Sequence, residues 1–394
     1  MKSAIAMTYE LDDISLAAKE LTSTIREKLE LKANTVAILF CVYDMEIVEL
    51  SALIGKELNC PVIGATTAVS ATLSNDGYHE LAIMLHVLTS DDCQFSTAIS
   101  NSMAADPEKE IEVTYKKAYA ELNAEPKMVM CLTAIIESLD SDSIVECVSN
   151  QCESLPVFGF NAGDDFEFKN QKVFLDDEIG GDRLALLLIS GNIQPVFHTA
   201  NLAGKQALEK RLVTKSDKNI IYEIEGKPAY EYIKGFPFID DETRSLFNYQ
   251  FFVELQDEAI NKGDPVSRAL STFDKETGSV TCFANVPENS YIGLKYCDGN
   301  DVANTTKAGI TELLAKMNDI KEYEFSTVIV ATCSLRHIFL AGMKDTEGRL
   351  INELIPKNLT VSGLHAFGEI APTSVSDNIA VNRFHNATFT VCAF

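Results

Sequence analysis

Three short stretches near the C-terminus contain most of the polar side chains that could act together chemically. The first ends a buried apolar run with a thiol and a cation, Cys333 and Arg336, in TVIVATCSLR. The second, SGLHAFGEIAP, places Glu369 in a glycine-rich turn. The third, FHNAT, opens the last apolar run with His385 and Asn386. These five residues are therefore the first candidates for a functional site.

A cation at the end of a buried strand is well placed to bind an anionic ligand. Ligands of open α/β sheets bind beyond the carboxyl ends of parallel strands, and TVIVATC has the length and apolarity of such a strand. The Arg336 guanidinium would hold a carboxylate through two parallel hydrogen bonds. Glu369 would accept hydrogen bonds from an ammonium or amide group. The structural alternatives are an ion pair between Arg336 and Glu369, or a carboxylate that only caps backbone N–H groups.

The remaining three residues allow either binding or catalysis. Cys333 beside Arg336 could ionise and act as a nucleophile with His385 as its base, although a buried cysteine at a strand end is more often inert. His385 and Asn386 need hydrogen-bond partners if they are buried, either in a ligand or in the protein. The sequence contains no GxGxxG, GxxxxGKS/T, HExxH or GxSxG motif. We therefore favour binding over catalysis and expect no cofactor.

The chain alternates helical and strand patterns, which is typical of α/β proteins. Residues 13–32 carry apolar side chains at helical spacing, with Asp12 or Asp13 as the N-cap. Residues 35–41, TVAILFC, have the length and composition of a strand that is buried on both faces. A helix over residues 44–58, a short strand with a small-residue turn, and a strand over residues 81–88 follow.

This layout occurs three times, the second copy beginning near residue 127 and the third near residue 327. We expect an α/β fold of mixed sheets, built from repeated strand–helix–strand–strand units that pack on one another. A cysteine at the end of the first strand and a glycine after the second strand mark each copy: Cys41 and Gly64, Cys131 and Gly159, Cys333 and Gly363. Six residues beyond the glycines stand Ser70, Asp165 and Glu369.

The second copy adds two adjacent acids, Asp164 and Asp165, to the candidates. They occupy the part of their copy that Glu369 occupies in the third, so we expect them on the opposite side of the same site. Adjacent carboxylates are also typical of hard-metal sites. No further oxygen ligands can be placed beside them, and we expect no metal.

Residues 192–325 follow a different pattern, in which short strands alternate with Gly, Pro and Asn turns at hairpin spacing. We place the main boundary near residues 195–212. The predicted division is an α/β domain over residues 1–200 with two units, and a domain over residues 201–394 that contains the strand-rich segment and the third unit.

Composition restricts the partners. The chain has 394 residues, 46% of them hydrophobic, and a formal net charge of −25. Nucleic acid and anionic membrane surfaces need a basic footprint, so we expect neither as a partner. No window approaches 18 uninterrupted apolar residues, and the N-terminus has no signal-peptide core. The sequence predicts a cytoplasmic protein with reduced thiols.

Several of these stretches resemble the FIST family. VIG at 62–64, LPVFGFNAGDD at 155–165 and the following GDRLALLLISG are similar to FIST-N, whereas VTKSDKNIIYEIEGKPAYEYI at 213–233 and NVPENSYIGL at 285–294 are similar to FIST-C. CSLR, SGLHAFGEIAP and FHNAT resemble the end of FIST-C. The chain departs from the family at Val69-Ser70, where FIST-N has a Gly-Glu pair.

The resemblance implies a stand-alone, bacterial-type, intracellular sensory protein that binds amino acids or their derivatives. We expect such a ligand between the two parts, held by Arg336, Glu369, His385 and Asn386 beside Cys333, with Asp164 or Asp165 opposite. The protein would signal through an unidentified partner protein or by a change of assembly. The alternatives are an interaction scaffold without a ligand, and an enzyme that uses Cys333 and His385.

Overall fold

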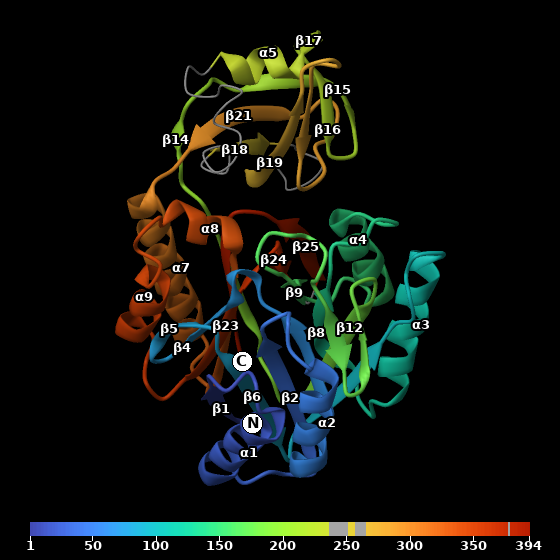
Figure 1. Ribbon diagram of the computed structural model, residues 1–394, viewed down its shortest axis with the longest axis vertical. Coiled ribbons are helices and arrows are strands. Elements are labelled where there is room, and N and C mark those ends of the chain that lie inside the picture. Colours follow the sequence, from blue (N-terminus) through green and yellow to red (C-terminus); the bar gives the residue numbers. More distant parts are fainter. Residues whose placement is uncertain (236–250, 257–264, 377–378) are drawn as a thin grey trace.

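The computed structural model describes residues 1–235, 251–256, 265–376 and 379–394. Its larger part, here called the body, contains three six-stranded mixed sheets with helices on their outer faces. A smaller part built mainly of β-strands, here called the barrel, lies above the body in Figure 1. The predicted α/β class with repeated units and mixed sheets is confirmed.

The first sheet and its helices come mainly from the N-terminal 90 residues. Its strands, in order across the sheet, are β1 (Lys2–Thr8), β6 (Ile83–Ser90), β2 (Asn34–Cys41), β3 (Val62–Thr66), β10 (Val173–Leu175) and β11 (Glu178–Gly180). Helices α1 (Ile14–Lys28) and α2 (Ile47–Leu58) pack on its outer face. Asp13 caps α1 by accepting a hydrogen bond from the Leu16 N–H. A short helix η1 (Ala68–Ser70) follows β3.

The second sheet repeats this plan. Its strands are β25 (Ile379–His385), β24 (Glu369–Ser376), β9 (Val157–Asn161), β8 (Pro126–Thr133), β12 (Leu184–Gly191) and β7 (Cys93–Ile99), and helices α3 (Pro107–Ala120) and α4 (Ser141–Gln151) cover it.

The third sheet consists of β13 (Val196–Asn201), β26 (Thr388–Ala393), β22 (Thr327–Cys333), β23 (Thr360–Ala366), β4 (Ala71–Ser74) and β5 (Gly77–Glu80). Helices α7 (Gly299–Asp319) and α9 (Thr346–Leu354) cover it, and the short helix α8 (Ser334–Phe339) directly follows β22.

Each sheet is completed by a hairpin from another unit. The hairpin β4–β5 of the first unit pairs with β23 in the third sheet, β24–β25 of the third unit pairs with β9 in the second, and β10–β11 of the second unit pairs with β3 in the first. The exchange is cyclic, so no unit can form its full sheet alone. The sequence pattern shows the three units but not this exchange.

The inner faces of the three sheets meet in one shared core. Phe40 of the first sheet and Phe160 of the second pack edge to face with ring centroids 5.9 Å apart, and Phe394 joins them after the last strand of the third. Such aromatic pairs contribute more than their buried area alone. The sheets therefore stabilise one another across a common interior.

The predicted glycine marks are structurally equivalent. In each parallel pair the glycine faces a residue of the first strand and one of the exchanged hairpin: Gly64 pairs with Leu39 and Phe174, Gly159 with Cys131 and Ile370, and Gly363 with Val330 and Leu73. A Cβ at Gly159 would lie 1.8 Å from the Cys131 carbonyl oxygen. These strands thus need glycine for close backbone approach.

Two of the predicted correspondences between the three copies are wrong: that of the cysteines and that of the acidic positions. Cys131 pairs directly with its glycine, whereas Cys41 and Cys333 lie beyond the residues that pair with theirs. Glu369 faces Phe160, one residue past the glycine. The residues in the equivalent places are Thr72 and Val173, not Ser70 and Asp165. The connection between the second strand and the hairpin differs in length from unit to unit, so residues at equal distance from the glycines do not occupy equivalent places.

The barrel is inserted between β13 and α7 of the third unit. Its elements are β14 (Lys205–Gln206), β15 (Arg211–Asp217), β16 (Ile220–Ile224), β17 (Lys227–Pro228), α5 (Ala229–Lys234), β18 (Phe251–Gln256), β19 (Val266–Asp274), β20 (Ser279–Cys282) and β21 (Tyr291–Tyr296). The antiparallel pairing runs from β21 through β15, β16, β20, β19 and β18 back to β21, which closes six strands on themselves. This is the strand-rich segment of the sequence. The division into domains at residue 200 stays a prediction.

Within the described residues, no helix has both the length and the apolarity that a membrane crossing requires.

We expect Gly159→Ala to destabilise the protein, because its methyl group would overlap the Cys131 carbonyl oxygen. The free energy of unfolding, measured by urea denaturation, should fall by about 2 kcal/mol or more. Gly342→Ala is the matched control, since a Cβ there has no neighbour within 4 Å. Equal stability of the two variants would contradict the close approach of β8 and β9.

Candidate ligand-binding site

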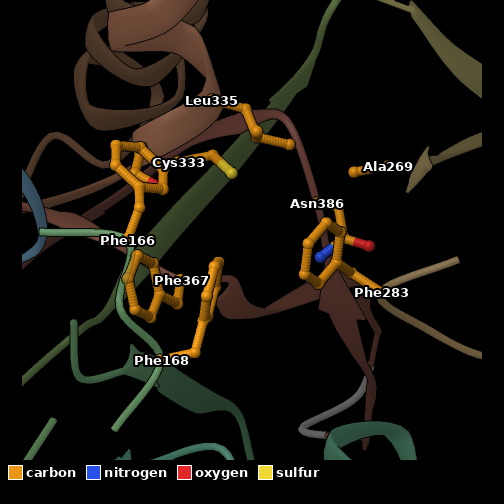
Figure 2. Close-up of a pocket in the computed structure, with 9 residues that line it drawn as sticks. Phe166, Phe168, Ala269, Phe283, Cys333, Leu335, Phe367 and Asn386 are labelled. Carbon is orange, nitrogen blue, oxygen red and sulfur yellow. The ribbon is translucent and has the colours of Figure 1, made fainter. Parts of the chain in front are cut away.

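A small pocket lies where the body meets the barrel (Figure 2). Its lining residues are Phe166, Phe168, Phe367, Cys333, Ser334, Leu335 and Asn386 from the body, and Ala269 and Phe283 from the barrel. The cavity has a volume of about 20 Å³, which is room for about one water molecule. Two predicted site residues, Cys333 and Asn386, are thus brought together in one wall.

Aromatic rings close the pocket. Figure 2 shows Phe166, Phe168 and Phe367 grouped on one side and Phe283 with Asn386 on the other. The ring of Phe168 stacks on Phe367, with centroids 4.6 Å apart, and on Phe283, with centroids 5.7 Å apart. Phe168 therefore links the body to the barrel, and a ligand larger than water has to part these rings.

Asp164 shapes the loop that carries Phe166 and Phe168. Its buried carboxylate accepts four backbone N–H bonds of 2.9–3.0 Å, from Glu167, Phe168, Lys169 and Asn170. The two phenylalanines have positive φ, 64° and 56°, a backbone conformation that residues other than glycine rarely adopt. The structure thus assigns Asp164 a role in holding the loop.

Asp165, the second acid of the pair, lies on the exposed side of the loop. It accepts a hydrogen bond of 3.1 Å from the hydroxyl of Ser70. Ser70, which stands where FIST-N has a glutamate, is therefore the hydrogen-bond partner of Asp165 and not its equivalent in the first copy. Among the described residues, no group of three or more His, Cys, Asp or Glu side chains is placed to hold a metal ion.

Arg336 lies on α8 with no exposed surface and does not line the pocket. Its Nε and Nη2 donate to Glu347 Oε1 at 3.0 and 2.9 Å, and Nη2 also donates to the Thr306 hydroxyl at 2.7 Å. Burial alone would raise the pKa of Glu347, but the guanidinium holds it below its usual value. The carboxylate partner of Arg336 is thus Glu347 on α9, and the alternative of an ion pair with Glu369 is not formed.

Glu369 joins the two segments that cross between the second and third sheets. It begins β24, just after the chain leaves the third sheet, and its Oε2 accepts hydrogen bonds from the hydroxyl (2.6 Å) and N–H (3.3 Å) of Thr388, where the chain re-enters it. Burial raises the pKa of Glu369 to about 8, although Thr388, Arg336 and Cys333 lower it. Near neutral pH this carboxyl group is therefore mostly protonated.

His385 faces Glu369 across the β24–β25 ladder and is also fully buried. Its Nε2 donates to the Ala371 carbonyl oxygen at 3.2 Å when the ring is neutral, and burial lowers its pKa to about 3. Asn386 donates from Nδ2 to the His385 carbonyl oxygen at 3.2 Å. Its Oδ1 has no hydrogen-bond partner among the described residues, although the side chain is only 2% exposed.

Cys333 ends β22 in the pocket wall. Burial raises the pKa of its thiol well above the usual value, Glu369 raises it further, and the backbone N–H groups of Leu335 and Ala387 lower it. Because the thiolate is the nucleophilic form, this environment does not favour an enzyme that uses Cys333 and His385.

Sequence reasoning missed the four phenylalanines of the lining. Two of them lie in the loop that follows GFNAGDD, and a third directly precedes Gly368. Aromatic residues within glycine-rich and acidic turns are unusual in a core, and that signal was available in the sequence. The fourth, Phe283, follows a barrel strand and gives no comparable signal.

We expect Asp164→Ala to loosen the pocket loop, because four backbone N–H groups lose their acceptor. The free energy of unfolding should fall by about 3 kcal/mol, and hydrogen exchange at residues 167–170 should accelerate. Asp165→Ala, which removes only the contact with Ser70, is the control and should lose less than about 1 kcal/mol. Unchanged exchange in Asp164→Ala would contradict the assigned role.

We expect Glu369→Gln to change the pH dependence of stability. The folded-state pKa of Glu369 is raised from 4.5 to about 8, so the wild-type protein loses stability as pH rises from about 4.5 to about 8. Glutamine does not titrate, so the variant lacks this loss of stability. The stability of Glu369→Gln relative to wild type should therefore increase between pH 5 and pH 8 by a few kcal/mol, which is the free energy that corresponds to a pKa shift of this size.

Thermal and urea unfolding across this pH range provide the measurement. The control is Glu324→Gln, at an exposed position, which should follow the wild-type profile. If wild type and Glu369→Gln keep a constant difference from pH 5 to pH 8, Glu369 does not have the raised pKa.

Comparison with known proteins finds two matching family models. The model described as the FIST N domain matches residues 35–227, and the one described as the FIST C domain matches residues 230–372. No curated protein matches the chain.

The solved structures that the chain matches have low sequence identity and low TM-scores. A crystal structure of cyanuric acid hydrolase from A. caulinodans is 7% identical, with a TM-score of 0.38 and coverage of 99% of this chain and 98% of that one. A second cyanuric acid hydrolase structure is 8% identical with a TM-score of 0.31, covering 100% and 99% of the two chains. PurLQS from Thermotoga maritima is 10% identical with a TM-score of 0.21, covering 99% and 72%.

The two family models together span most of the chain, and they confirm the resemblance seen in its sequence. The protein belongs to the FIST family, with consecutive FIST N and FIST C domains of the sensory type.

Proposed function

We propose that this protein is a small-ligand sensor whose ligand, an amino acid or a derivative of one, binds in the pocket between body and barrel. One observation carries the proposal: the pocket is lined by aromatic rings from both parts of the chain. Phe166 and Phe168 come from the region matched by FIST N, whereas Phe283 and Phe367 come from the region matched by FIST C. A ligand there touches both regions at once.

The docking of the barrel supports a signalling role for this position. Arg268 of the barrel, 1% exposed, forms an ion pair of 3.1 Å with Asp142 of α4 and donates to the Phe384 carbonyl oxygen at 3.2 Å. An apolar cluster that contains Ala269 and Leu335 completes the junction. A ligand that parts Phe283 from Phe168 would shift the balance between arrangements of barrel and body. A partner protein would read that shift.

We assign the predicted site residues to two roles. Cys333 and Asn386 line the pocket and would contact the ligand. Arg336, Glu369 and His385 would position the wall behind them, and Asp164 would position the opposite loop. Asp165 would act through Ser70 at the outer side of that loop.

Thermal unfolding with a panel of amino acids and amino-acid derivatives tests the proposal. At least one compound should raise the Tm of the wild-type protein, increasingly with its concentration. Phe283→Ala should lose this response because it removes the barrel side of the pocket. Tyr291→Ala, at a 51% exposed position elsewhere on the barrel, is the control and should keep it.

Two results would contradict the proposed function. One is a panel in which no compound stabilises the wild-type protein. The other is a compound that stabilises Phe283→Ala as strongly as wild type, because its site would then lie elsewhere.

A further inference from the structure

The lining of the pocket also specifies the charge of its ligand. Resting on the proposed function, we infer that the pocket takes an uncharged ligand: an apolar, preferably aromatic, group that carries an N–H or O–H donor, such as the amide of an apolar amino acid. The free carboxylate and the free ammonium group are excluded. The inference depends on four features of the described residues.

The first feature is the lining itself. Its described members are four phenylalanines, Leu335, Ala269 and three polar but uncharged residues, Cys333, Ser334 and Asn386. A carboxylate or ammonium group that leaves water needs an opposite charge or several hydrogen bonds to offset its desolvation. This wall provides neither, so it favours an uncharged group.

The second feature is the position of the nearby cations. Arg336 follows directly on the lining residues but does not line the pocket itself. Its Nε and Nη2 donate to Glu347, Thr306 and the Val302 carbonyl oxygen, while its Nη1 is buried and has no partner among the described residues. To reach a carboxylate ligand the guanidinium would leave Glu347 buried and unpaired, which is strongly unfavourable. Neither half of that buried pair is available to the pocket.

Arg268 is the second cation near the junction, and it faces away from the pocket. It is the neighbour of the lining residue Ala269 on β19, and adjacent residues of a strand point to opposite faces. Its guanidinium pairs with Asp142 and donates to the Asn285 carbonyl oxygen. Among the described residues of the barrel, a carboxylate ligand thus finds no cation in the pocket lining either.

The third feature concerns ligands with an ammonium group. Glu369 is fully buried and does not line the pocket. Thr388 donates twice to its Oε2, and its Oε1 has no partner among the described residues. Burial keeps this carboxyl group mostly protonated near neutral pH, since its pKa is raised to about 8. It therefore does not provide the negative charge that a buried ammonium group needs.

The fourth feature is the unpaired acceptor. Asn386 uses its Nδ2 for the His385 carbonyl oxygen, and its Oδ1 is left without a partner in a side chain that is 2% exposed. A buried acceptor without a donor is unfavourable. A ligand N–H or O–H would supply the missing bond, while the stacked rings of Phe168, Phe283 and Phe367 would hold its apolar part.

Four related compounds separate the effects of a carboxylate and of an ammonium group on binding. They are N-acetyl-L-phenylalaninamide (neutral), N-acetyl-L-phenylalanine (carboxylate), L-phenylalaninamide (ammonium) and L-phenylalanine (both). Calorimetric titration of the full-length protein at pH 7 should show the neutral compound binding at least about tenfold more tightly than each charged one. Asn386→Leu should weaken binding of the neutral compound by about tenfold, and thermal unfolding shows that the variant is folded.

Asn386→Asp is the second variant, because it places a negative charge in the same volume. It should reverse the order and bind L-phenylalaninamide more tightly than the neutral compound. A preference for either charged group by the wild-type protein, or no binding of any of the four, would overturn the inference. The proposed function would still stand if another compound of the larger panel bound in a manner that requires Phe283.

Discussion

The exchange of hairpins between the three sheets is the constraint on which the rest of the body depends. A unit that gives its hairpin away cannot complete its own sheet, so the chain has to cross from sheet to sheet three times and return. Three of the crossing segments are the turn before β24, the turn between β25 and β26, and the loop between β9 and β10. Phe367, Asn386 and Phe168 belong to these segments. The pocket is thus a consequence of how the sheets are completed, and the barrel supplies its remaining side.

The ionisable residues of the third unit act on this framework rather than in the pocket. Arg336 fixes α8 against α9 through Glu347, and Glu369 fixes one crossing segment to the other through Thr388. Breaking a buried pair by removing one partner costs about 3–5 kcal/mol. These residues are therefore poor candidates for binding a ligand reversibly, and the uncharged wall in front of them is a better one. The same arrangement explains why stretches that contain Arg336, Glu369 and His385 surround an apolar cavity.

Much of the body follows from local sequence patterns. Apolar runs such as TVAILFC predict β2, the helical spacing after Asp13 predicts α1, and the recurring glycines identify the three parallel pairs. The hairpin exchange does not follow, because it depends on contacts between units and leaves the pattern within each unit unchanged. The partner of Arg336 was missed because Glu347 lies in a helical segment with no motif. The phenylalanine lining was missed because apolar side chains are usually assigned to a core, and only the folded loop of Asp164 shows that they face a cavity.

The central claim is that a ligand binds between Phe283 of the barrel and the phenylalanines of the body. The chain contains no tryptophan, so Phe283→Trp would place a single tryptophan in the pocket. Its emission should change with the concentration of a bound ligand, and the midpoint of that change should equal the midpoint that calorimetry gives for the same protein. A calorimetric binding curve without any change in that emission would contradict the account.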